Sequence, residues 1–183
     1  MKRSKITILL AIVLGMTFHS CLDLEPQDQL GGKNMWTSVN DYKQFANTFY
    51  SWTRDFSSVV YDGTHSDKRS DLITYQSYNE FSRGINSIPS SDANYTDNYK
   101  HIRRTNLLLQ SAEAYAKPED IKQYIGEAYF FRAYSYFDLL QLYGDVIITK
   151  KPLDITDPEM KVKRNDRSEV VDLIIDDLNH AVE

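Results

Sequence analysis

The stretch from Pro118 to Gly144 constrains the fold more than any other part of the chain. Pro118 suits the first position of a helix, because the N–H that proline lacks has no partner there. Glu119 and Asp120 place negative charge at the positive end of the helix dipole. Gly144 offers a left-handed residue that ends a helix. The sequence therefore predicts one long helix between Pro118 and Gly144.

Apolar side chains cover most of the circumference of this predicted helix. One face, spaced by three and four residues, consists of Ile121, Tyr124, Ile125, Ala128, Arg132, Ser135, Leu139 and Leu142. A second apolar face consists of Phe130, Phe131, Tyr134 and Phe137. Such a helix must pack on two sides, and the small residues Gly126, Ala128 and Ala133 allow a neighbouring helix to approach closely. Arg132 lies within the apolar face and therefore needs a buried partner.

Periodic apolar residues predict three further helices. The first begins at a capping-box-like Ser38–Asp41 and ends near Arg54, the second runs from Tyr95 to about Ala116, and the third runs from Asp166 to Glu183. Asn106 lies on a packed face of the second helix and needs a hydrogen-bond partner. Asp145 to Arg164 contains two prolines and is predicted to be an extended connector outside any sheet. The expected fold is all-α.

Periodicity is lost from Phe56 to Asp92, a stretch rich in Ser, Asp, Tyr and Gly. Irregular segments of this length are uncommon in compact domains and are often functional. We therefore predict a long irregular loop, at residues 57–92, between the first two helices.

The N-terminus has the pattern of a lipoprotein signal. A positive start is followed by the apolar run Ile6–Phe18 and then by Ser20 and Cys21. Bulky Phe18 disfavours an ordinary signal-peptidase site, so we expect residues 1–20 to be removed and Cys21 to be lipidated. The alternative is a buried free cysteine near an uncleaved helix. Cys21 is the only cysteine, so no intramolecular disulfide can form.

The charge balance excludes some partners. Residues 1–20 hold three of the 21 basic residues, so the remaining chain has 18 against 26 acidic residues, a net charge of −8. This charge argues against binding nucleic acid, and against binding anionic lipid by charge alone. The 13 tyrosines can pack in a core, and they can also provide flat amphipathic surface for sugars.

The long helix resembles the core helix of the SusD/RagB-like proteins. The resemblance rests on the run Gly126–Tyr134, on Tyr136 and Phe137, and on Leu142–Val146. The spacing of Tyr95, Tyr99, Ile102, Asn106 and Leu109 resembles the preceding helix of that family, and Leu22–Pro26 resembles the start of its mature proteins. The resemblance implies a tetratricopeptide-like helical bundle, in which residues 21–183 form an incomplete N-terminal SusD-like domain. It also implies a surface-exposed outer-membrane lipoprotein that binds oligosaccharides beside a SusC-like TonB-dependent transporter.

The loop carries the residue types that sugar recognition needs, which are flat aromatic rings and planar charged groups. We single out Asp67, Arg69, Asp71, Tyr75 and Tyr78 as candidate ligand-binding residues. A similar stretch with Arg and Asp lies at this position in many SusD-like proteins. The alternative is that Arg69 and Asp71 pair with each other or with helix ends and only hold the loop.

The sequence shows no catalytic pattern, and we expect neither an enzyme nor a cofactor. It contains no phosphate-binding Gly-rich loop and no Gly-x-Ser-x-Gly or His-Glu-x-x-His motif. Asp67 and Asp71 lack the apolar surroundings that would raise a pKa for glycosidase chemistry. Together with Asp62 and His65 they also fail to match a calcium loop. Two interpretations therefore remain, a glycan-binding lipoprotein and a tetratricopeptide-like scaffold that binds proteins and has no sugar site.

Overall fold

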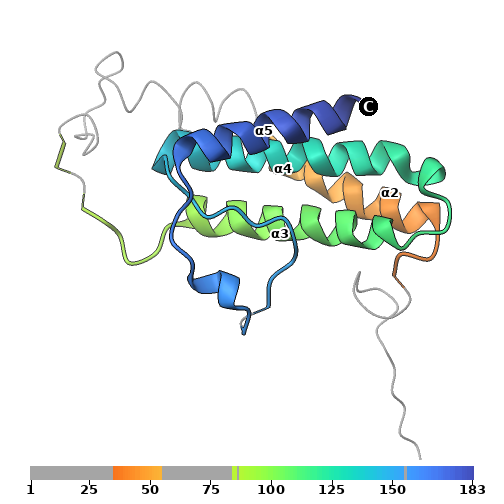
Figure 1. The fold of residues 1–183 in the computed structure, drawn as a ribbon, viewed down its shortest axis with the longest axis horizontal. Coiled ribbons are helices and arrows are strands. Elements are labelled where there is room, and N and C mark those ends of the chain that lie inside the picture. Colours follow the sequence, from red (N-terminus) through yellow and green to blue (C-terminus); the bar gives the residue numbers. More distant parts are fainter. Residues whose placement is uncertain (1–34, 55–83, 86, 155) are drawn as a thin grey trace, which may run out of the picture. The chain divides into compact units, whose positions relative to one another are not determined.

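The computed structural model describes residues 35–54, 84–85, 87–154 and 156–183, and every element within them is helical (Figure 1). The α-helices are α2 (Val39–Asn47), α3 (Ala93–Glu113), α4 (Lys122–Tyr143) and α5 (Arg167–Val182), and the short 3₁₀ helices are η1 (Thr48–Trp52), η4 (Pro118–Ile121) and η5 (Pro158–Lys161). The only strand-like pairing among these residues is one antiparallel bridge between Val146 and Asn165. The predicted all-α class is confirmed.

The long helix α4 has nearly the predicted ends. Pro118 begins a 3₁₀ turn instead of the α-helix itself, which starts at Lys122. Gly144 ends the helix with a φ of +70°, and its N–H donates to the carbonyl of Leu140 at 3.0 Å. A positive φ favours glycine, which explains the residue at this position.

Helix α4 packs between two antiparallel neighbours, α3 and α5 (Figure 1). It approaches α5 closely at Gly126, where a Cβ atom would lie 3.1 Å from the carbonyl oxygen of Ala181. Ala128 and Ala133 are both fully buried, as their predicted role in helix contacts requires. Small residues on α4 therefore set how closely the helices pack.

The apolar core consists of two clusters that meet along α4. The first joins α2 and η1 to the first half of α4 and contains Tyr42, Phe45, Ala46, Phe49, Leu108, Ala112, Ile121, Ala128 and Phe131. The second joins α5 to the second half of α4 and contains Ile102, Ala133, Tyr136, Leu139, Val146, Val170, Leu173 and Ile174. Full burial of one large apolar side chain is worth roughly 1.5–3 kcal/mol, so these clusters supply most of the stabilisation.

The second apolar face of α4 is only partly covered. Phe131 is buried, whereas Phe130 is 44% exposed and Phe137 is 46% exposed. The prediction that this side of the helix is also packed therefore holds for Phe131 but not for Phe130 and Phe137. The reason is geometric, because α2, α3 and α5 already surround the rest of the α4 circumference.

The first predicted helix changes character after Asn47. Its start is as expected, since the Ser38 N–H donates to the Asp41 carboxylate at 2.8 Å. The hydroxyls of Thr48, Ser51 and Thr53 each donate to the carbonyl three residues earlier, at 2.6 to 2.8 Å. Such bonds compete with the regular α-helical pattern, so the chain continues as 3₁₀ helix to Trp52 instead of as one helix to Arg54.

The connector, residues 145–164, runs alongside α3 and α4 without joining a sheet. Its backbone is hydrogen-bonded by helix side chains instead. The Tyr99 hydroxyl bonds both the N–H and the carbonyl of Ile147, at 2.9 and 2.8 Å. Tyr136 does the same for Thr149, at 2.7 and 3.2 Å. Asn106 also donates to the Thr149 carbonyl, at 2.9 Å, which satisfies the amide that the sequence placed on a packed face.

Candidate functional site

The candidate residues from the sequence lie outside the described residues. These are the ligand-binding candidates Asp67, Arg69, Asp71, Tyr75 and Tyr78, together with the lipidation candidate Cys21. Their roles therefore stay predictions. What the structure shows is how the ends of the 57–92 loop are held.

The start of the loop is held by α4. The Arg54 guanidinium forms an ion pair with Asp138, and both side chains are mostly buried. The Arg54 N–H donates to the Tyr134 hydroxyl at 3.4 Å, and the guanidinium lies 5.7 Å from the centre of that ring. The chain therefore leaves η1 against the second half of α4.

The end of the loop is held by the same part of α4. The Tyr143 hydroxyl donates to the carboxylate of Asp92 at 2.6 Å. Asp92 also caps α3 by accepting from the Asn94 N–H at 2.9 Å. The hydrogen bond from Tyr143 is the main cause of a lowered pKa for Asp92. Arg54 and Asp92 are therefore both bonded to the second half of α4, a convergence that the sequence did not reveal.

An aromatic group adjoins the start of the loop. Trp52 stacks on His101 with ring centres 4.0 Å apart and an angle of 13° between the rings. Burial is the main cause of a lowered pKa for His101, which favours its neutral form at pH 7. Tyr50 is 52% exposed and contacts Phe131 edge to face. These rings pack η1 against α3 and α4 next to Arg54.

The partner that Arg132 needs is Asp177 on α5. The Arg132 Nε and Nη2 atoms donate to the two carboxylate oxygens of Asp177, at 2.8 and 2.6 Å. Nη1 donates to the Asn106 side chain at 2.8 Å. Arg132 is 5% exposed and Asp177 is fully buried, so this pair joins α3, α4 and α5 inside the core. The sequence predicted the need for a partner but missed Asp177, because it lies among several acidic residues of α5.

Two kinds of feature were not found in the described part of the chain. No three His, Cys, Asp or Glu side chains there are placed to hold a metal ion. No helix among the described elements is both long enough and apolar enough to cross a membrane. The residues Asp62, His65, Asp67 and Asp71, whose spacing does not match a calcium loop, all lie in the range that is not described.

The chain is similar to known proteins along almost all of its length. A family model described as "Starch-binding associating with outer membrane", one of the SusD-like families, matches residues 22–183. A SusD-like protein from Formosa agariphila is 28% identical, over 98% of this chain and 37% of that protein. The crystal structure of a SusD-like protein from Bacteroides fragilis superposes with a TM-score of 0.66 at 24% identity, over 86% of this chain and 31% of that one.

These similarities establish the family of the chain and how much of a family member the chain covers. The likeness to the crystal structure establishes the fold. With coverages of 37% and 31%, the chain spans about a third of the length of these relatives. Because the family model matches far more than half of the residues, the chain belongs to the SusD-like family.

Proposed function

We propose that this chain is part of a cell-surface lipoprotein of the outer membrane that binds oligosaccharides and delivers them to a SusC-like TonB-dependent transporter. The observation that carries the proposal is the match of residues 22–183 to a family described as starch-binding and associated with the outer membrane. The proposed role is binding without catalysis.

The proposed ligand-binding region is the 57–92 loop, with Asp67, Arg69, Asp71, Tyr75 and Tyr78 as its contact residues. Support comes from the ends of the loop, since Arg54 and Asp92 are both bonded to the second half of α4. Holding both ends on one rigid helix reduces the number of conformations available to the segment between them. The residues on both sides of the proposed binding region are therefore held in place before a ligand binds, which lowers the entropy cost of binding.

Calorimetric titration of residues 21–183 with a panel of oligosaccharides tests this proposal. We expect at least one oligosaccharide to bind with a dissociation constant in the millimolar range. Tyr75→Ala should weaken it about fivefold or more, because stacking of an aromatic ring contributes roughly 1 kcal/mol or more. Arg69→Ala should also weaken it, whereas Arg164→Ala, which removes an exposed arginine of the connector, should not.

Two results would contradict this assignment. Equal affinities for the wild type, Arg69→Ala and Tyr75→Ala would show that the loop is not the binding region. Absence of binding across the whole panel would favour the alternative, a helical scaffold that binds proteins and has no sugar site.

The proposed membrane anchor has a test of its own. Two or more acyl chains hold a protein at a membrane stably, where one chain does not. We expect cells that express the chain to incorporate a clickable palmitate analogue into the wild type and not into Cys21→Ala. Equal labelling of the two proteins would remove the lipoprotein part of the proposal.

A further inference from the structure

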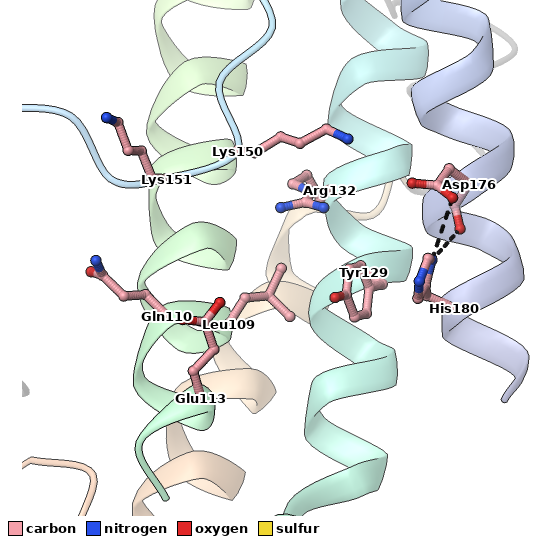
Figure 2. A pocket seen from close by; sticks show the side chains of 9 residues that line it. All are labelled: Leu109, Gln110, Glu113, Tyr129, Arg132, Lys150, Lys151, Asp176 and His180. Atoms are coloured by element: carbon pink, nitrogen blue, oxygen red, sulfur yellow. Dashed lines mark hydrogen bonds and ion pairs between the residues drawn. The ribbon is translucent and has the colours of Figure 1, made fainter.

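A cavity of about 320 Å³ lies next to Arg132, between α3, α4, α5 and the connector (Figure 2). Its lining includes Glu113 of α3, Tyr129 and Arg132 of α4, Lys150 of the connector and His180 of α5. Its volume is at the lower end of the range for small-molecule sites, about 300–1,000 Å³, so it suits a ligand the size of a monosaccharide. The lining residues that the structure describes do not include the loop residues considered above.

Arg132, which lines this cavity, has N–H groups that donate to none of the described residues. A guanidinium carries five N–H groups, and three of those in Arg132 donate to Asp177 and Asn106. The other two have no partner among the described residues. Arg132 is only 5% exposed, and buried donors generally need an acceptor. An oxyanion in the cavity would supply one.

Lys150 adds a second positive charge on the same side. Figure 2 shows its side chain extending toward α4, near Arg132. The neighbouring Lys151 amine is bound to Glu159 at 2.7 Å, whereas none of the described residues forms an ion pair with Lys150. Lys150 is therefore available for an anionic ligand group. Hydrogen bonds that involve charged groups are the stronger ones.

Tyr129 offers its hydroxyl to the cavity, while Arg132 and His180 both lie against its ring. Arg132 lies 5.2 Å from the ring centre, and the His180 ring stacks on Tyr129 at 4.9 Å with an angle of 26°. Figure 2 shows the Tyr129 hydroxyl directed toward α3. His180 itself is bonded through Nδ1 to the backbone of Asp176 at 2.8 Å. The hydroxyl is therefore the group that Tyr129 offers to a ligand in this cavity.

The Glu113 carboxylate is a hydrogen-bond acceptor at the opposite end of the cavity. Figure 2 shows Glu113 well apart from Lys150, with its carboxylate beside Leu109. The other acidic residue of the lining, Asp176, faces His180 at 3.7 Å. A carboxylate such as Glu113 accepts hydrogen bonds from ligand hydroxyls. The cavity thus combines cations at one end with an acceptor at the other.

We propose that this cavity is a second binding site, which takes a small polyhydroxylated carboxylate such as a uronic acid. The ligand carboxylate would bind Arg132 and Lys150, and its hydroxyls would bind Glu113 and Tyr129. This site is additional to the loop in the proposed function, and it does not depend on whether the loop binds glycans.

Titration of residues 21–183 with sodium glucuronate tests the proposal, with glucose as the neutral comparison at the same ionic strength. We expect saturable binding of glucuronate and binding of glucose about tenfold weaker or more, since the carboxylate makes the charge-assisted contacts. Lys150→Gln should weaken glucuronate binding about fivefold or more. Lys43→Gln, which removes an exposed lysine of α2, should leave it unchanged.

Three results would overturn this second site. They are equal binding of glucuronate and glucose, no effect of Lys150→Gln, or no saturable binding of glucuronate. Arg69→Ala separates this site from the loop, because it should not change glucuronate binding. Loss of glucuronate binding in Arg69→Ala would place the acid in the loop and contradict the cavity assignment.

Discussion

Arg132 carries a positive charge into the interior of the helical unit, where it is 5% exposed. Two hydrogen bonds to Asp177 and one to Asn106 compensate for the water that it loses. The pKa of Arg132 is raised above its usual value, because although burial lowers it, the Asp177 carboxylate has the larger effect in total. The guanidinium is therefore charged at every pH at which the protein folds.

Removing one member of this pair should be strongly destabilising. Asp177→Ala leaves Arg132 buried without its counter-charge, so we expect the free energy of unfolding to fall by about 3–5 kcal/mol. Asp172→Ala removes an exposed acid from the same helix and should change the free energy of unfolding by less than about 0.5 kcal/mol. Urea unfolding of both variants measures the difference. Similar values for the two would show that the pair does not hold the core together.

The bond between Tyr143 and Asp92 predicts a dependence of stability on pH. The hydrogen bond from Tyr143 lowers the Asp92 pKa in the folded protein, so it favours the charged carboxylate. The stabilisation from this bond is fully present above the pKa that Asp92 has in the unfolded chain, about 3.9. It is lost as the pH falls through the lower pKa that Asp92 has in the folded protein. We expect Tyr143→Phe to destabilise the protein at pH 6 and to differ less from the wild type at pH 3. A difference in unfolding free energy that is constant from pH 6 to pH 3 would contradict this account.

At the scale of the elements, α4 determines how the other helices pack. Its small residues allow close contact with α5, and its two halves belong to different core clusters. Ala133 is 1% exposed in the second cluster. A larger side chain would have no space at this position, and a charged side chain would have no partner there.

Replacing Ala133 with glutamate tests this role of α4. The new side chain would overpack the contact and bury a charge, so we expect a loss of about 3 kcal/mol or more. Gln141→Glu introduces the same residue at an exposed position of α4 and should have little effect. Thermal melting of both variants measures the difference. An unchanged melting temperature for Ala133→Glu would mean that α4 is not the centre of the fold.

The helices were predictable from the sequence, whereas most of their partners were not. Periodic apolar residues, the start at Ser38 and the stop at Gly144 are local signals, and the structure follows them. The pairing of Arg132 with Asp177 spans 45 residues and depends on how two helices dock. The backbone bonds made by Tyr99 and Tyr136 are of the same kind, because tyrosine spacing alone does not reveal which carbonyl a hydroxyl meets.

The exposure of Phe130 and Phe137 depends on the rest of the bundle in the same way. Sequence periodicity places both on an apolar face, but only packing decides whether a neighbour covers that face. For the candidate site, the sequence supplied the residue types of the 57–92 loop, and the structure added where its ends are held, at Arg54 and Asp92.

At the scale of the whole molecule, the chain spans 37% and 31% of the two relatives described above. Sugar sites exchange hydrogen bonds with water for hydrogen bonds with protein, so their net affinity depends on the complete set of contacts. A loss of about 3 kcal/mol reduces affinity more than a hundredfold. This is why we expect residues 21–183 to bind oligosaccharides only in the millimolar range. Micromolar binding would show that these residues contain a complete site.

The central claim is that the 57–92 loop, held at both ends on α4, is the glycan-binding region. Hydrogen–deuterium exchange of residues 21–183, with and without an oligosaccharide that binds, tests it most directly, because it reports which backbone amides the ligand protects. The account predicts slower exchange in peptides from residues 57–92 and unchanged exchange in α2 and in the exposed turns of α5. Protection confined to other segments, with no change in residues 57–92, would contradict it.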